Sequence, residues 1–209
     1  MHRRHSAALL GLALVATAAP SCGREPLERI CPDIAAGDLV ITEIRGKQSD
    51  PADTYGQWIE VYNPTDAAIP LAGITFYLYK LDGSGDFRFL IRDLDAEVPA
   101  GGYAVLAGEA AADKDFTTYT FTSDEDGDLY AAAIIEVYSC ENEVDRMLYR
   151  SLPALGTLSL DGAVPPSAEL NDTTDDPIWC VDATPPDPNQ PIIELGIRGT
   201  PGEANRPCM

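Results

Sequence analysis

Histidine is almost absent from this chain, and both of its histidines lie within the first five residues. His2 and His5 belong to a basic segment that precedes an uncharged apolar run, residues 7–19. This arrangement is typical of an export signal, which is removed from the mature protein. The mature chain is then expected to lack histidine, which excludes Ser-His-Asp and Cys-His catalysis and histidine-based zinc sites.

Closely spaced cysteines and a membrane-spanning apolar run are lacking as well. The apolar run of residues 7–19 is too short to cross a bilayer, which takes about 20 apolar residues. The five cysteines show no C-x-x-C spacing, so a thiolate metal site is not expected. We therefore expect no cofactor and no resident metal, and any catalysis would have to rest on carboxylates.

Positive charge is scarce. The full sequence has 14 Lys and Arg against 34 Asp and Glu. Without the two signal arginines, Arg3 and Arg4, the balance is 12 against 34, or −22. Nucleic-acid binding and electrostatic docking on anionic lipid both need clustered basic residues, so neither partner is expected.

A sustained helical period of apolar residues is also missing. Instead, short alternating or β-branched runs are separated by Gly, Pro, Asn and Asp, a pattern typical of a β-sandwich. The strands predicted in this way are residues 38–44, 58–62, 74–79, 87–91, 103–107, 130–138, 144–149 and 178–181. We expect an all-β fold with long loops.

Four short motifs occur in a fixed order along the chain. They are residues 56–64 (GQWIEVYNP), 71–73 (LAG), 99–103 (PAGGY) and 199–205 (GTPGEAN). Together they resemble the lamin-tail domain family, whose fold is an immunoglobulin-like β-sandwich. The resemblance implies a structural or interaction module, often attached to exported bacterial proteins, with no catalytic residues to carry over. The chain departs from the family by extra segments near residues 117–129 and 165–191.

The N-terminus allows two interpretations of how the chain is exported. Residues 19–22 (APSC) are similar to a bacterial lipobox, in which Cys22 becomes lipidated, whereas residues 16–18 (ATA) fit ordinary cleavage and secretion. Lipidation of Cys22 leaves an even number of cysteines, which favours it. We expect a signal in residues 1–21, a lipidated tether in residues 22–37 and the sandwich in residues 38–209. The location would be the cell envelope, as an outer-membrane lipoprotein, or else outside the cell.

The remaining four cysteines are expected to form two disulfides in an oxidising compartment. Four cysteines allow three pairings. We predict Cys31–Cys208, which would clamp the two ends of the domain, and Cys140–Cys180, which would lie within the sandwich.

A basic and aromatic patch is predicted on one β-hairpin. Alternation places Tyr77 and Tyr79 on the face opposite the apolar residues of their strand, and Arg88 and Arg92 on the matching face of the returning strand. Aromatic and Arg residues are frequent at binding hot spots. The patch predicts a binding surface for an envelope protein or a surface polysaccharide; ordinary cross-strand pairing is the alternative.

Two groups of carboxylates remain to be considered. Asp124, Asp126 and Asp128 are candidates for a calcium loop, but the EF-hand spacing fails, so a solvated acidic turn is expected. Glu60, with Glu43, would be the pair for a carboxylate-dependent hydrolase of an extracellular polymer. Family glutamates on such strands more often hydrogen-bond the backbone or lie on the solvated face, so we expect a non-catalytic binding or structural domain, with the hydrolase as the alternative.

Overall fold

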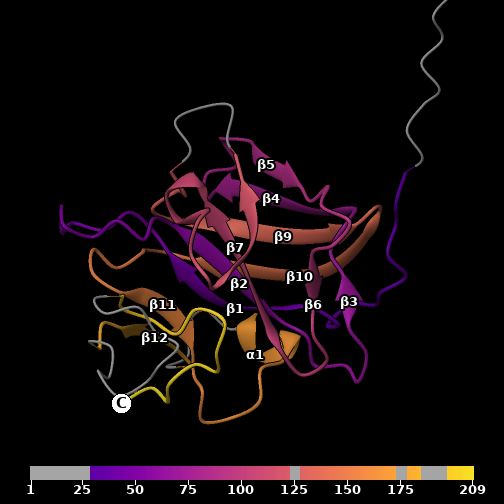
Figure 1. Ribbon diagram of the computed structural model, residues 1–209. Helices are drawn as coiled ribbons and strands as arrows, with labels where there is room; N and C mark the ends of the chain where they lie inside the picture. Colours follow the sequence, from indigo (N-terminus) through magenta and orange to yellow (C-terminus); the bar gives the residue numbers. More distant parts are fainter. Residues whose placement is uncertain (1–28, 123–127, 173–177, 185–196) are drawn as a thin grey trace, which may run out of the picture.

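The computed structural model describes residues 29–122, 128–172, 178–184 and 197–209, and nearly all of its regular structure is β (Figure 1). Two main sheets pack face to face, so the predicted all-β sandwich is confirmed. No helix among the described residues is long and apolar enough to cross a membrane.

The larger sheet has six strands in the order β12-β11-β1-β2-β7-β8. Only β7 and β8 are parallel, and the short 3-10 helix η1 (Glu109–Ala111) lies in their connection. The strand bounds are Val40–Arg45 for β1, Trp58–Tyr62 for β2, Tyr103–Gly108 for β7, Thr117–Phe121 for β8, Thr157–Leu160 for β11 and Trp179–Asp182 for β12.

The smaller sheet has four antiparallel strands in the order β10-β9-β4-β5. It consists of two hairpins, β4–β5 and β9–β10, as the turn residues predicted. The bounds are Ile74–Lys80 for β4, Phe87–Leu90 for β5, Ala133–Ser139 for β9 and Asn142–Tyr149 for β10. A third, two-stranded sheet pairs β3 (Ile69–Pro70) with β6 (Glu97–Val98).

The core lies between the two main sheets and forms because each strand turns one apolar face inward. Ile59 and Val61 of β2 meet Phe76 and Leu78 of β4 in one cluster of buried side chains. Trp58, on the other face of β2, belongs to a smaller cluster outside the sandwich. The alternation predicted for this strand is therefore confirmed.

The short strands β3 and β6 and the 3-10 helix η1 were not predicted as regular structure, and neither were three further elements. Strands β8 and β11 lack strong apolar alternation, and the single helical turn α1 (Ala168–Asn171) follows a Pro-rich loop. All three are held by neighbours distant in sequence: β8 by β7, β11 by β1 and β12, and α1 by β1 and β10. Their presence depends on tertiary contacts that local propensity does not contain.

Both disulfides form, but the predicted pairing is wrong. The bonds are Cys31–Cys140 and Cys180–Cys208, with Cα atoms 5.5 and 5.8 Å apart. Cys140 lies at the tip of the β9–β10 hairpin in the four-stranded sheet, whereas Cys180 lies on β12 at the far edge of the six-stranded sheet. Because a disulfide needs Cα atoms within about 7 Å, these two cysteines do not pair.

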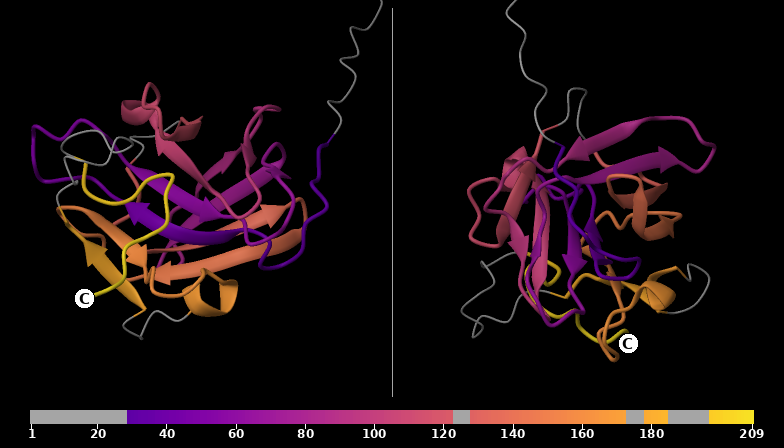
Figure 2. Two further views of the ribbon diagram at one scale, coloured as in Figure 1. Left: turned by 60° about the horizontal axis from the view of Figure 1, so that its bottom comes forward. Right: turned by 90° about the vertical axis from the view of Figure 1, so that its right-hand side faces the viewer.

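The C-terminal strap, residues 197–209, crosses the outer face of the six-stranded sheet (Figure 2, yellow). It starts with the buried Ile197, which packs in the small cluster around Trp58, and ends beside β12 at the Cys180–Cys208 bond. One sheet therefore has its outer face covered by the end of the chain.

Candidate functional site

A groove of about 460 Å³ lies at the edge of the sandwich where β5 and β8 meet. We call it the edge groove. Its described lining residues come from β4, β5, β8 and the segments that follow β5 and β8: Thr75, Tyr77, Arg88, Phe89, Leu90, Arg92, Tyr119 and Thr122. The structure thus brings together three of the four predicted patch residues.

The β4–β5 hairpin positions these side chains. Tyr77 lies opposite Arg88 in the strand register, and Thr75 lies opposite Leu90. Phe89, between these two positions, points into the core and is almost fully buried. The same alternation that buries the phenylalanine leaves Arg88 and Leu90 on the open side.

Strand β8 closes the other side of the groove. The Phe121 ring stacks on Phe89 with ring centroids 4.7 Å apart, which joins the edge of one sheet to the edge of the other. The Tyr119 hydroxyl donates a hydrogen bond of 3.3 Å to the backbone carbonyl of Leu90. These contacts fix the groove between two rigid strands.

The charge of the groove is positive. None of its described lining residues is acidic, and neither Arg88 nor Arg92 makes an ion pair or side-chain hydrogen bond within the described part of the chain. Arg146, on the same outer face of the sheet, instead pairs with Glu136 at 3.6 Å. The two groove arginines therefore keep their donors for a ligand.

Tyr79 lies next to the groove but does not line it. Its ring is parallel to that of Tyr77, with centroids 6.3 Å apart, and Tyr138 meets Tyr77 edge-on at 5.6 Å. Desolvation and the nearby Glu136 charge raise the pKa of Tyr79, so its phenol stays neutral. Tyr79 supports Tyr77 rather than the groove surface itself.

Sequence reasoning missed the residues that complete the groove from outside the hairpin. Tyr119 and Thr122 lie in a segment that the family resemblance treats as an insertion. Thr75, which belongs to the hairpin and shares the face of Tyr77, was missed as well. Residues 117–121 (TTYTF) are rich in β-formers, which was the available signal for a strand.

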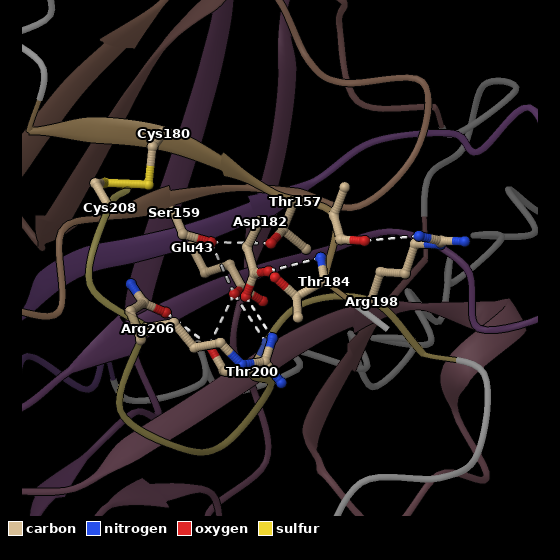
Figure 3. A network of polar contacts seen from close by, with 12 residues as sticks. Glu43, Thr157, Ser159, Cys180, Asp182, Thr184, Arg198, Thr200, Arg206 and Cys208 are labelled. Carbon is tan, nitrogen blue, oxygen red and sulfur yellow. Dashed lines mark hydrogen bonds and ion pairs between the residues drawn. A yellow bond between two sulfur atoms is a disulfide. The ribbon is translucent and has the colours of Figure 1, made fainter. Parts of the chain in front are cut away.

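A second polar cluster lies under the C-terminal strap, on the outer face of the six-stranded sheet (Figure 3). Glu43 of β1 accepts hydrogen bonds of 3.0 Å from Trp58 Nε1 and from Ser159 Oγ. Thr200 of the strap donates to Glu43 from both its backbone N–H and its hydroxyl, at 3.0 and 3.1 Å. The Glu43 carboxylate thus joins three separate parts of the chain.

Glu60 lies directly opposite Glu43 in the β1–β2 register. It accepts from Thr42 Oγ1 at 2.8 Å and from the backbone N–H of Gly202 at 2.7 Å. Burial raises the pKa of Glu43, and burial together with the Glu43 charge raises the pKa of Glu60 well above its usual value. Both side chains are fully buried, so a substrate reaches neither carboxylate while the strap is in place.

The strap motif, residues 199–205, fits these carboxylates closely. Gly199 has a φ of +108°, and a Cβ there would lie 2.9 Å from Glu43 Oε1. Asn205 donates to the carbonyl of Thr42 at 2.8 Å and of Leu160 at 3.0 Å. The glycine and the asparagine of the motif therefore dock the strap on β1 and β11.

Of the remaining predicted site residues that the structure describes, Asp128 joins neither cluster. Asp128 accepts from Gln57 Nε2 at 2.7 Å and pairs with Lys47 at 3.1 Å, so it is already engaged by protein groups. Asp124, Asp126 and Cys22 lie outside the described residues. Among the residues that the structure describes, no group of three or more His, Cys, Asp or Glu has a metal-binding arrangement.

Comparison with known proteins finds no protein-family model that matches this chain and no matching curated protein.

Proposed function

We propose that this chain is a cell-envelope lipoprotein whose domain acts by binding, through the edge groove, and not by catalysis. The observation that carries this proposal is the groove itself: two tyrosines and two arginines without an ion-pair partner among the described residues line a cavity of about 460 Å³ on a strongly acidic protein. This volume is within the range of about 300–1,000 Å³ typical of ligand sites. The carboxylate pair, by contrast, is enclosed and hydrogen-bonded within the protein.

The positions of the four sequence motifs support a lamin-tail-like, immunoglobulin-like sandwich. Residues 58–62 form β2, residues 71–73 follow β3, and residues 99–103 lead into β7. Residues 199–205, more than 130 positions from β2, donate to Glu60 of that strand through Gly202. The first and the last motif, far apart in sequence, are thus hydrogen-bonded to each other on one sheet, as expected if they belong to one structural family.

The two disulfides support an oxidising compartment, where such bonds persist. With Cys31 bonded to Cys140, residues 23–30 would be all that separates a lipidated Cys22 from the first disulfide. Fully extended, eight residues reach no more than about 30 Å. We therefore propose that the domain acts close to the membrane surface.

The lipid anchor is tested by fractionation of cells that express the full chain with Cys22→Ser. We expect the variant to move from the membrane to the soluble fraction. Unchanged membrane retention would contradict the lipoprotein assignment while leaving the binding proposal intact.

Groove binding is tested by co-sedimentation of the mature chain with isolated bacterial cell envelopes. We expect the double variant Arg88→Ala/Arg92→Ala to lose most of the bound fraction. Arg146→Ala removes the same charge from the same outer face and should bind like the parent chain. Equal binding by all three proteins would show that the groove is not the binding site.

A further inference from the structure

We infer that the edge groove binds a carboxylate-bearing polysaccharide, a chain that contains uronic acid units. This inference rests on the proposed binding function and adds the class of ligand. It follows from the kind, spacing and accessibility of the groups that line the groove.

The two arginines specify an anion. A guanidinium matches a carboxylate with two parallel hydrogen bonds, and Arg88 and Arg92 are both exposed with no internal partner among the described residues. Backbone pairing between Ile91 and Ile74 keeps this segment extended. Four residues of extended chain separate the arginines by about 13 Å. Two cations at this spacing fit two carboxylates on one polymer better than a single small anion.

The surface between and beside the arginines suits a sugar. Thr75, Thr122 and Tyr119 provide hydroxyl groups that bond the hydroxyls of a polyhydroxylated ligand. The Tyr77 ring and the exposed Leu90 add apolar surface of the kind that packs against the flat face of a sugar ring. The described lining residues thus combine hydroxyl, aromatic and cationic groups, and none of them is acidic.

An acidic peptide added as a further β-strand is disfavoured by the hydrogen bonding at the edge of β5. Strand addition needs free outward-facing backbone groups. The outward carbonyl of Leu90 already accepts from the Tyr119 hydroxyl at 3.3 Å. A peptide would have to displace this contact, whereas a sugar chain lying across the side chains would not.

A densely charged polymer such as nucleic acid is disfavoured by the rest of the molecule. The full chain has a formal charge of −20, and the described lining of the groove contains two arginines. At physiological ionic strength charges are screened beyond about 8 Å. The arginines therefore attract nearby carboxylates, while the acidic surface around them repels double-stranded nucleic acid, which carries one negative charge per about 1.7 Å of its length.

The ligand class is tested by calorimetric titration of the mature chain with oligomers of galacturonic acid, of mannuronic acid and of a glucuronic acid-containing chain. We expect at least one to bind, and its methyl-esterified, uncharged form to bind at least tenfold more weakly. Raising the salt concentration should weaken binding by the acid form. A poly-glutamate peptide is titrated in parallel as the peptide comparison.

Titration of arginine variants with the same oligomers tests whether they bind in the groove. Arg88→Ala and Arg92→Ala should each lower the affinity about tenfold, and Arg88→Lys by less, because lysine keeps the charge but loses the paired hydrogen bonds. Arg146→Ala should change the affinity less than twofold. Circular dichroism of each variant confirms that it is folded.

Three results would overturn the inference: no binding by any of the three uronate oligomers, equal binding of acid and esterified forms, or tighter binding of the poly-glutamate peptide. If envelope co-sedimentation still depends on the arginines in such a case, the proposed function stands and the ligand class is wrong. If no uronate oligomer binds and envelope co-sedimentation does not depend on the arginines either, the proposed function is wrong as well.

Discussion

The outer faces of the two sheets both carry charged and aromatic residues, but the residues are buried on one face and accessible on the other. On the six-stranded sheet, Glu43, Glu60 and Trp58 point outward, and the C-terminal strap covers all three completely. On the four-stranded sheet, Tyr77 and Arg88 also point outward, yet no described segment covers them. A charged or aromatic residue on a strand therefore indicates function only once its hydrogen-bonding capacity is accounted for.

The two faces differ in how many hydrogen-bond donors and acceptors of the charged side chains already have a partner within the protein. Glu43 accepts four hydrogen bonds from Trp58, Ser159 and Thr200, so it has nothing left to offer a ligand. Arg88 has five N–H donors and no internal partner within the described residues. The first face is assembled for stability and the second is left available for recognition.

The largest effect should come from breaking the covered face. Glu43→Ala leaves several buried donors without an acceptor, each costing about 1–3 kcal/mol, so we expect a loss of about 3–5 kcal/mol in the free energy of unfolding. Glu136→Ala is the matched change on the open face and should cost less than about 1 kcal/mol, because it removes one partly exposed ion pair and one long hydrogen bond, 3.4 Å, from the Tyr138 hydroxyl. Denaturant unfolding of the oxidised mature chain measures both.

Glu43→Gln refines this test, because it keeps the size of the side chain and one acceptor oxygen. We expect an intermediate loss of stability. A Glu43→Ala variant as stable as Glu136→Ala would show that the strap does not depend on the buried carboxylate.

The strap should also depend on its disulfide. Replacing both Cys180 and Cys208 with Ala opens a loop with a sequence separation of 28. In the chain-entropy model such a bond contributes about 3–4 kcal/mol. We expect that loss in denaturant unfolding, together with early hydrogen exchange at the backbone amides of Thr200 and Gly202. If exchange begins instead at the β4–β5 hairpin, the strap is not the part that the bond secures.

A third buried carboxylate should make stability depend on pH. Asp145 of β10 accepts from the backbone N–H of Ile41 and from Asn171 Nδ2, both at 2.7 Å, and burial raises its pKa to about 7. A raised pKa means that the folded chain holds the proton more tightly. The resulting stability is full below about pH 4 and is lost as the pH rises to about 7.

We therefore expect the free energy of unfolding to fall by about 2–3 kcal/mol from Asp145 between pH 5 and pH 8. Glu43 and Glu60 have raised pKa values and act in the same direction, as does the repulsion of a net charge of −20. Asp145→Asn isolates the first contribution, because it should flatten the pH dependence while the others remain. An unchanged pH profile would exclude Asp145 as the cause.

Alternation was sufficient to predict most of the sandwich strands, but not the bulges within them. In residues 39–44, strict alternation places Glu43 on the same face as Leu39 and Ile41, toward the core. A bulge between Ile41 and Glu43 shifts the register, so Ile44 enters the core and Glu43 turns outward. Bulges depend on the partner strand, which a single strand's sequence does not describe.

The candidate site shows the same limit. The hairpin half of the groove was predictable, because Tyr77, Arg88 and Arg92 lie on adjacent strands joined by a recognisable turn. Tyr119 was not predictable, because it reaches the groove from the other sheet through contacts between β5 and β8. The disulfide pairing failed for a related reason: it depends on which sheet each cysteine belongs to.

The smallest effect we predict separates two neighbouring tyrosines on the open face. Tyr77 lines the groove, whereas Tyr79 is stacked beside it on the same face and does not line the groove. Tyr77→Ala should therefore weaken envelope binding about fivefold to tenfold, or about 1 kcal/mol. Tyr79→Ala should weaken it less than twofold, because it removes only a neighbour of Tyr77. Both variants remove one tyrosine side chain from the same face of β4 and should lose similar, small amounts of stability. A difference in binding therefore reports on the groove alone. Equal losses of binding would show that the whole tyrosine face contacts the ligand and that the groove is only part of a broader surface.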